Sequence, residues 1–284
     1  MNIFELEKTI DLPSVPIPSD DEFTTRYVRT RKPILLDRVA ERLKFVANWS
    51  LDYFAQRLQT IRVQQPSTDG VYHYLGFERV PYEDFSRGLT TQENRYALEP
   101  LIGFGAPQGS KKDRSVDFDE SAVPTFIPSG KLRVSNLYIG PGSNKSLLHF
   151  DEVHGLLIMV EGQKRFSLFP PDQTKNMYPY SVFNLKSVAQ HRVLDSKVNA
   201  DNLDFRRFPR IRNAKGWHGV IKPGQALFIP AGTWHYIESD DLNVAVNYFW
   251  HQSKFTDWLN RPLLEFWIKR REVLLIDIAR KLLR

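Results

Sequence analysis

The chain has 284 residues, of which 42% are hydrophobic and 25% charged, and its 39 Lys and Arg against 33 Asp and Glu leave a formal charge of +6. These values are typical of a globular protein and exclude a disordered, collagen-like or coiled-coil chain. Because the sequence has no cysteine, disulfides, thiolate metal sites, iron–sulfur clusters and a cysteine nucleophile are also excluded. A metal ion would have to be bound by histidine and carboxylate side chains.

The beginning of the sequence, MNIFELEKTI, contains acidic side chains and no apolar leader segment. No apolar run approaches the ~20 residues that a membrane-spanning helix requires. We therefore expect a cytoplasmic protein without a membrane partner. The net positive charge favours an acidic partner such as nucleic acid, but it is spread over a long chain and is a weak signal.

Residues 1–130 have the pattern of a mixed α/β region that packs on the domain after it. The proline-rich residues 1–18 are expected to be extended, because proline disfavours the helical conformation in the residue before it. Ser19 and Glu22 match a capping box at the start of a helix, and Ser50 is expected to cap a second helix that runs to Leu58. Short strands are expected over 32–36, 60–65 and 71–75.

Residues 131–252 change to a series of short β-type runs separated by turn residues such as Pro-Gly pairs. This pattern predicts a β-sandwich or barrel of the jelly-roll type. The stretch 170–216 is too long for a hairpin, so we expect it to be an insertion over one end of the barrel. The predicted strands are 132–139, 146–151, 156–161, 164–169, 217–221, 226–229, 234–239 and 243–250.

Residues 253–284 return to a helical pattern. Apolar side chains recur there at spacings of three and four, and charged side chains take the other face. This predicts C-terminal helices. They either pack on the barrel or form the contact of a homodimer.

His149, Asp151 and His235 are the candidate metal ligands. Side chains at i and i+2 of a strand point the same way, so His149 and Asp151 both face the barrel interior if their strand is placed as predicted. A third imidazole from the later strand that carries His235 would complete two histidines and a carboxylate on one face of Fe(II), which leaves positions for a co-substrate and O₂. The alternative is that each histidine is an ordinary structural residue of a strand.

Lys164 is the second informative residue. Alternation along 164–169 places it on the same inward face as Phe166 and Leu168. A buried ammonium is costly unless an anion meets it. The lysine either extends out of the barrel mouth, pairs with an internal carboxylate, or anchors the far carboxylate of a dicarboxylate co-substrate whose other end binds the metal.

A basic run extends from Arg206 to Lys215 and is interrupted by Phe208 and Ile211. One interpretation is a surface beside the active-site mouth that attracts an acidic peptide or RNA. The other is a solvated loop that Phe208 anchors to the rest of the molecule.

Several motifs together resemble the JmjC-type 2-oxoglutarate oxygenases, in particular the factor-inhibiting-HIF asparaginyl hydroxylase and its cupin-like bacterial relatives. The resemblance spans most of residues 132–250. It is carried by the segments HFDE at 149–152, GQKR at 162–165, LFPPDQ at 168–173, YPY at 178–180, FP at 208–209, PG at 223–224, IP at 229–230, WHYIES at 234–239 and VN at 246–247.

The resemblance implies a Fe(II)- and 2-oxoglutarate-dependent dioxygenase that consumes O₂ and releases succinate. His149, Asp151 and His235 would bind Fe(II), and Lys164 would bind the far carboxylate of 2-oxoglutarate. Hydroxylation of a protein or peptide side chain is the first expectation; the alternatives are a tRNA-base hydroxylase, a metal cupin that does not use 2-oxoglutarate, and a non-catalytic binding module. Further co-substrate contacts are expected from Ser146, Asn247, Tyr138 and Tyr96.

Two departures separate this chain from the asparaginyl hydroxylase. Gly155 stands where that enzyme has asparagine. The segment 181–203, where that enzyme grips its substrate, differs in sequence and length. The same protein target is therefore not expected. The other five histidines, His73, His154, His191, His218 and His251, are predicted to be surface or packing residues.

Overall fold

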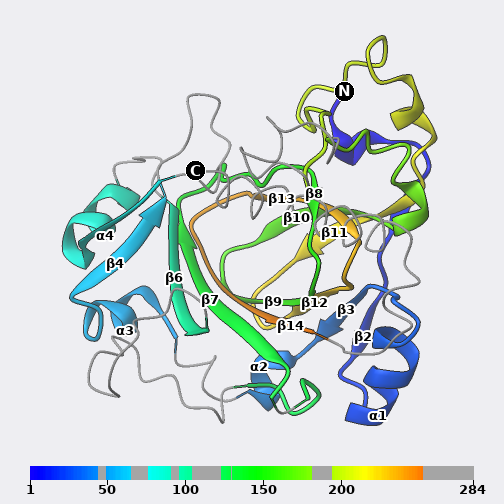
Figure 1. The fold of residues 1–284 in the computed structure, drawn as a ribbon. Coiled ribbons are helices and arrows are strands. Elements are labelled where there is room, and N and C mark those ends of the chain that lie inside the picture. The colour runs from blue at the N-terminus through cyan, green and yellow to red at the C-terminus, as the bar shows by residue number, and fades with distance from the viewer. Residues whose placement is uncertain are drawn as a thin grey trace, which may run out of the picture.

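Two β-sheets face each other across the interior of a barrel, and together they make the protein mainly β (Figure 1). The computed structural model describes residues 1–43, 49–64, 76–90, 96–103, 123–128, 130–180 and 194–251. Within these ranges the smaller sheet has the strand order β1-β11-β10-β13-β8, and the larger has the order β2-β3-β12-β9-β14-β7-β6-β4-β5. The helices of these ranges are all too short or too polar to cross a membrane.

The second half of the chain supplies the barrel strands, which pass back and forth between the two sheets except that β10 and β11 are neighbours in the smaller one, as expected of a jelly roll. In Figure 1, β9, β12 and β14 lie across the interior from β10 and β13. The mainly β prediction is confirmed. The strands are β7 (Leu132–Gly140), β8 (His149–Phe150), β9 (His154–Glu161), β10 (Lys164–Phe169), β11 (Gly216–Ile221), β12 (Ala226–Ile229), β13 (Trp234–Ser239) and β14 (Asn243–Trp250).

The first half of the chain adds strands to both sheets. β1 pairs with β11, β2 pairs with β3, β3 pairs with β12, and β6 joins β4 to β7. The N-terminal region is thus hydrogen-bonded into the barrel sheets rather than only packed on them. Its strands are β1 (Thr9–Asp11), β2 (Ser14–Pro16), β3 (Ile34–Asp37), β4 (Thr60–Gln64), β5 (Phe77–Pro81) and β6 (Tyr96–Gly103).

Short helices connect the N-terminal strands. The two predicted caps form, because the Ser19 hydroxyl accepts the backbone N–H of Glu22 and the Ser50 hydroxyl accepts that of Tyr53. The helix after Ser50 ends at Ala55 and is shorter than predicted. The helical segments are η1 (Ile3–Glu5), α1 (Asp20–Phe23), η2 (Thr24–Val28), α2 (Val39–Arg42), α3 (Leu51–Ala55) and α4 (Tyr82–Thr90).

Three apolar clusters hold the layers together. The first packs the N-terminal helices on the outer face of the larger sheet through residues such as Phe23, Phe54 and Tyr248. The second lies between the sheets and includes Phe166 and Leu168. The alternating apolar side chains of the barrel strands therefore point into the interior, as the sequence pattern predicts, because one face of each sheet is buried there.

The third cluster shows where the insertion lies. Phe208 and Ile211, in and beside the short helix η6 (Pro209–Asn213), pack with Phe150 and Trp234 on the outer face of the smaller sheet. The described part of the insertion therefore covers a sheet face, whereas the sequence predicted a position over one end of the barrel. The insertion takes this position because its apolar side chains pack against the outward-facing aromatic residues of β8 and β13.

The insertion also shortens a predicted strand. β8 contains only His149 and Phe150, although the sequence predicted a strand over 146–151. The backbone of Phe150 donates to Leu194, and Ser196 donates to Leu148, so the insertion takes hydrogen bonds on one side of this segment. The predicted strand at 71–75, His73, His191 and the C-terminal helices at 253–284 lie outside the described residues.

A glycine closes the turn between β9 and β10. Gly162 has a φ of +70°, and a Cβ at this position would lie 2.1 Å from the backbone oxygen of Leu242. Only glycine accepts both the left-handed conformation and the close approach. The tight turn places Lys164 at the first position of β10.

Candidate metal centre and co-substrate pocket

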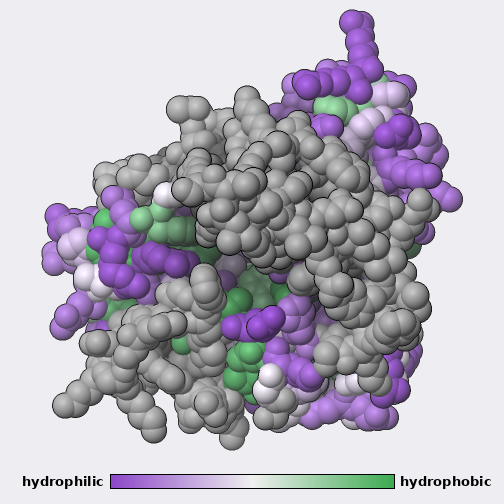
Figure 2. Space-filling model, in the orientation of Figure 1, coloured by the Kyte–Doolittle hydropathy of each residue, from purple (hydrophilic) through white to green (hydrophobic). Residues whose placement is uncertain are grey.

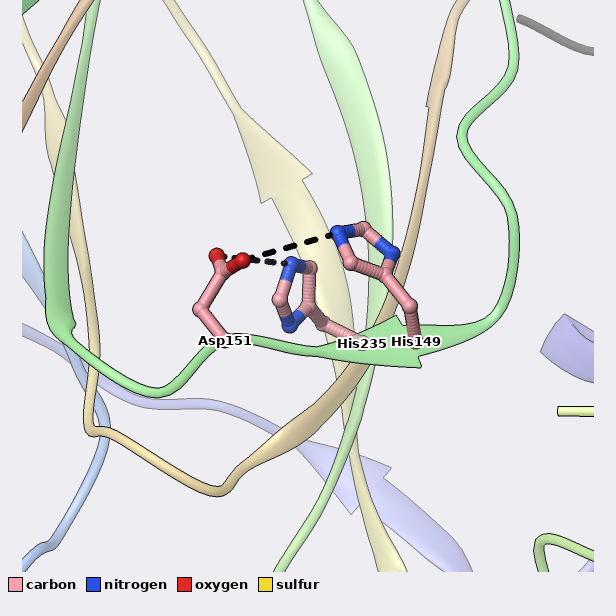
Figure 3. Close-up of side chains that lie close together, drawn as sticks. All are labelled: His149, Asp151 and His235. Carbon is pink, nitrogen blue, oxygen red and sulfur yellow. Dashed lines mark ion pairs between the residues drawn. The ribbon is translucent and has the colours of Figure 1, made fainter. Parts of the chain in front are cut away.

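The three candidate metal ligands converge at one end of the smaller sheet (Figure 3). His149 on β8 lies directly opposite His235 on β13, with ring centroids 4.2 Å apart. Asp151 follows β8 and turns its carboxylate toward both rings. Its oxygens lie 4.0 Å from His149 Nε2 and 3.6 Å from His235 Nε2.

Backbone carbonyl groups fix the orientation of both imidazoles. His149 Nδ1 lies 2.7 Å from the Leu147 oxygen, and His235 Nδ1 lies 3.0 Å from the Thr233 oxygen. Each Nδ1 therefore carries the proton and donates it to a carbonyl group. This leaves the lone pair on each Nε2 directed toward Asp151, which is the arrangement that metal-binding histidines adopt.

The charges of this group also fit a metal site. Burial lowers the pKa of His235 well below its ordinary value, and the nearby His149 lowers it further. Burial raises the pKa of the Asp151 carboxyl, although His149 opposes this shift. Neutral imidazoles are the metal-binding form, and a carboxylate withdrawn from water gains most from a cation beside it. Two nitrogens and one oxygen fit Fe(II) in a facial triad.

Lys164 lies in the interior, as predicted. It is 3% exposed, and its Nζ donates to the Ser239 hydroxyl at 2.6 Å and lies 5.6 Å from the centre of the Tyr96 ring. Among the described residues no carboxylate lies within ion-pair distance of this ammonium. Burial lowers the pKa of Lys164 to about 7, and Asp241 acts in the opposite direction. Neither extension to solvent nor an internal ion pair is found, so an anionic ligand is the remaining interpretation.

One cavity, open at its mouth, connects the histidines with Lys164. The remaining predicted co-substrate residues, Ser146, Asn247, Tyr138 and Tyr96, all line it. The Tyr138 and Tyr96 rings stack with centroids 5.7 Å apart, and the Tyr138 hydroxyl group contacts the side-chain amides of Asn136 and Asn247. The structure thus brings every predicted site residue to one pocket.

Comparison with known proteins gives the family. Residues 20–256 match the cupin-like domain, which is most of the chain. The chain belongs to the cupin-like domain family.

Relatives of this cupin-like protein carry further names. "Lysine-specific demethylase 8" of Xenopus tropicalis is 26% identical over 253 residues, covering 86% of this chain and 54% of the relative. "Jumonji C domain-containing protein 5" of Drosophila melanogaster is 26% identical, covering 84% of this chain and 60% of the relative. "HSPB1-associated protein 1" of Homo sapiens is 38% identical over 124 residues, covering 43% and 24%. The cupin-like protein spans 60% or less of the length of each of these relatives.

Two glycines shape the pocket of the cupin-like protein. A Cβ at Gly140 would lie 2.5 Å from the Tyr96 ring and 2.2 Å from Asn144 Oδ1, so only glycine lets these two side chains take their positions beside Lys164. A Cβ at Gly155 would lie 3.6 Å from Asn247 Oδ1 and 3.5 Å from the Phe249 ring. Gly155 therefore leaves room beside Asn247 instead of filling it with a side chain.

Three uncharged polar residues of the pocket were missed by sequence reasoning: Ser239, Asn144 and Gln64. Ser239 had a usable signal, because it follows His235 by four positions on β13 and alternation places both on the inward face. Asn144 lies between strands, and Gln64 lies in the N-terminal region. Neither position has a periodicity that relates it to the barrel interior.

Two of the other described histidines, His154 and His218, fit structural roles. His154 is 1% exposed, accepts the backbone N–H of Ala231 at 3.1 Å and packs beside the rings of Phe228 and Trp250. Burial lowers its pKa to about 3, so it stays neutral. His218 contacts Thr9 and Asp11 of the N-terminal arm. Within the described ranges, His149, Asp151 and His235 form the one group that could hold a metal ion.

Proposed function

We propose that this protein is a Fe(II)- and 2-oxoglutarate-dependent oxygenase that hydroxylates a side chain of a protein or peptide. The observation that carries the proposal is the pairing of a histidine–aspartate–histidine group with a buried lysine that lacks a carboxylate partner among the described residues, in one cavity. This is the donor set for a metal and for the far end of a dicarboxylate. The relatives named demethylases support a protein as the substrate.

His149, Asp151 and His235 would hold iron on one face and leave the cavity side open. Bound iron supplies the redox chemistry by which O₂ converts 2-oxoglutarate to succinate and CO₂ and adds one oxygen atom to a substrate C–H bond. The protein supplies the geometry. The carbonyl groups of Leu147 and Thr233 keep the two Nε2 atoms aimed inward.

The Lys164 end of the pocket would hold the co-substrate. Its ammonium would bind the far carboxylate, and the Ser239 hydroxyl group holds the ammonium in place. Ser146 lies beside β13, the strand that carries Ser239, and its Oγ already accepts the backbone N–H of Ile237 at 2.9 Å, so its own hydrogen is free to point to a carboxylate oxygen. The apolar side chains of Leu157, Ile237 and Phe249 limit the water around the reacting groups.

A basic surface on the insertion indicates the kind of partner that the protein binds. We define this basic surface as Arg206, Arg207, Arg210, Arg212 and Lys215. All five side chains are exposed, and none has a carboxylate within ion-pair distance among the described residues. The lobe formed by the insertion and the N-terminus, at the upper right of Figures 1 and 2, is largely hydrophilic. We propose that this surface attracts an acidic segment of the protein substrate.

RNA is the alternative partner for the same surface. Three of its arginines stack on aromatic rings, Arg207 on Phe208, Arg210 on Tyr178 and Arg212 on Phe205. Phe208 is itself buried, so it also anchors the insertion and is not open to a nucleic-acid base.

The likeness to the asparaginyl hydroxylase, the dimer and the cytoplasmic location stay predictions.

The proposal is tested by loading the protein with Fe(II) and 2-oxoglutarate without oxygen, adding degenerate peptide pools or total tRNA, and then admitting oxygen. We expect succinate, and a peptide product heavier by the mass of one oxygen atom. A product in the tRNA alone would identify a tRNA hydroxylase. Failure of 2-oxoglutarate to bind the metal-loaded protein would instead identify a metal cupin that does not use this co-substrate. Binding of RNA without formation of succinate would identify a non-catalytic binding module.

The low pKa of Lys164 predicts how co-substrate affinity depends on pH. The pKa is about 7 in the ligand-free protein, and a bound carboxylate favours the charged form, so above this pH binding must take up a proton. Affinity for 2-oxoglutarate should fall by about threefold from pH 6.5 to 7.5 and by about eightfold from pH 7.5 to 8.5, as the charged fraction of Lys164 falls. Calorimetry on the zinc-loaded protein at pH 6.5, 7.5 and 8.5 measures this. Constant affinity from about pH 7 to 9 would contradict the assignment.

A further inference from the structure

Gln64 is a buried polar residue of the pocket that the proposed mechanism does not use. It is the last residue of β4 and lies directly opposite Tyr96 in the pairing of β4 with β6. It is 3% exposed and lines the same cavity as the metal ligands. Its side-chain Nε2 is buried and has no hydrogen-bond partner among the described residues. The cavity wall therefore contains an amide group whose Nε2 is unpaired in the described part of the protein.

An amide in this position is expected to meet a ligand. Buried N–H groups in native proteins are nearly always paired, because an unpaired one loses its hydrogen bonds to water and gains nothing in return. The cavity is also open at its mouth, so a substrate side chain can reach Gln64 from solvent. A route of entry and a hydrogen-bonding group thus remain after the co-substrate has been placed between the triad and Lys164.

The charges around the cavity indicate the chemistry of that ligand. Of the described residues that line it, Asp151 is the one carboxylate, and it belongs to the metal group. Lys145 is neutralised by Asp201 at 2.9 Å, and Lys164 is assigned to the co-substrate. A lysine or arginine side chain entering the cavity would find no free carboxylate there. Burying an unpaired charge is costly, whereas a neutral polar group needs only a hydrogen bond.

We infer that Gln64 binds the side chain of the substrate and selects an uncharged, hydrogen-bonding group, an amide or a hydroxyl, against a cationic one. A carboxamide offers both a donor and an acceptor, so it pairs with either group. The neighbouring Leu98 and Tyr96 supply an apolar wall for the carbon atoms of such a side chain. This inference rests on the proposed function, because it assumes that a substrate side chain enters this cavity.

The test uses the zinc-loaded protein with 2-oxoglutarate bound, in which no turnover occurs, and fluorescent peptide pools that differ only in a central residue. The central residue is Asn, Gln, Ser, Leu, Lys or Arg, and fluorescence anisotropy gives the dissociation constants. We expect the wild-type protein to bind the Asn, Gln or Ser pools at least about tenfold more tightly than the Lys and Arg pools, the effect of roughly one good hydrogen bond.

Three variants separate selection from a packing effect. Gln64→Leu keeps the size of the side chain and removes the hydrogen bond. Its affinity for the Asn, Gln and Ser pools should therefore fall by about tenfold, while its affinity for the Leu pool should stay unchanged. Gln64→Glu keeps the shape and adds a carboxylate, so it should turn the preference toward the Lys and Arg pools. Gln59→Leu, at an exposed position just before β4, is the matched control and should behave as the wild type.

The outcomes distinguish this inference from the proposed function. If 2-oxoglutarate does not bind the metal-loaded wild-type protein, the proposed function fails. If it binds, but the wild type favours the cationic pools or shows no preference, or Gln64→Leu keeps the wild-type preference, the inference about Gln64 is overturned. A Gln64→Leu protein that binds the peptide pools normally but 2-oxoglutarate tenfold more weakly would place Gln64 in the co-substrate site and also overturn it.

Discussion

Replacing His235 with alanine is expected to remove iron binding and to lower succinate formation by at least about a hundredfold. The imidazole is 4% exposed and supplies one of the three donor atoms of the metal group, and no other described group lies in position to replace it. The two ligands that remain are His149 and the Asp151 carboxyl, whose pKa is already raised by burial. Metal content after dialysis and succinate detected by NMR measure the two effects.

The control for this variant is His218→Ala. His218 contacts the N-terminal arm and lies outside the metal group, so its loss should leave iron content and turnover unchanged. A His235→Ala protein that still converts 2-oxoglutarate at the wild-type rate would show that the triad is wrongly assigned. Equal loss in both variants would point to a general effect on folding.

Replacing Lys164 with methionine should change stability and binding in opposite directions. The ammonium is buried without a carboxylate partner among the described residues, and burial lowers its pKa to about 7. An apolar side chain of similar length removes this desolvation cost, so we expect the free energy of unfolding to rise by about 1 to 4 kcal/mol. Affinity for 2-oxoglutarate should fall by about 10- to 100-fold, because a charged hydrogen bond is lost.

Thermal unfolding and calorimetry of the zinc-loaded protein measure these two effects. Lys222→Met, at an exposed position, is the matched control and should change neither. If Lys164→Met lowered stability, the lysine would have a stabilising partner in the protein itself. If it left affinity for 2-oxoglutarate unchanged, the co-substrate would be anchored elsewhere.

Period-two alternation was sufficient to predict the reactive part of the site. His149, Asp151, Lys164 and His235 lie in or beside short strands, and a strand gives each side chain a direction. The barrel strands at 164–169, 226–229, 234–239 and 243–250 were predicted with their observed bounds. The sequence pattern is strong there because one face of each strand is buried in the interior.

The parts that could not be predicted depend on contacts between distant segments. β8 is shorter than its sequence pattern because the insertion hydrogen-bonds beside it. Gln64 reaches the cavity because β4 pairs with β6 and β6 with β7, and no periodicity within β4 contains that information. Asn144 occupies its position because Gly140 has no side chain. Each of these depends on which segments become neighbours.

The pairing of the N-terminal strands with the barrel also determines how the protein avoids aggregation. β1 covers the outer edge of β11, β3 covers that of β12, and β6 covers that of β7. An uncovered edge strand offers unpaired N–H and C=O groups to the same edge of another molecule. A shortened protein that began at β7 would expose three such edges at once. The first half of the chain thus acts as an intramolecular cover for the edges of the barrel sheets.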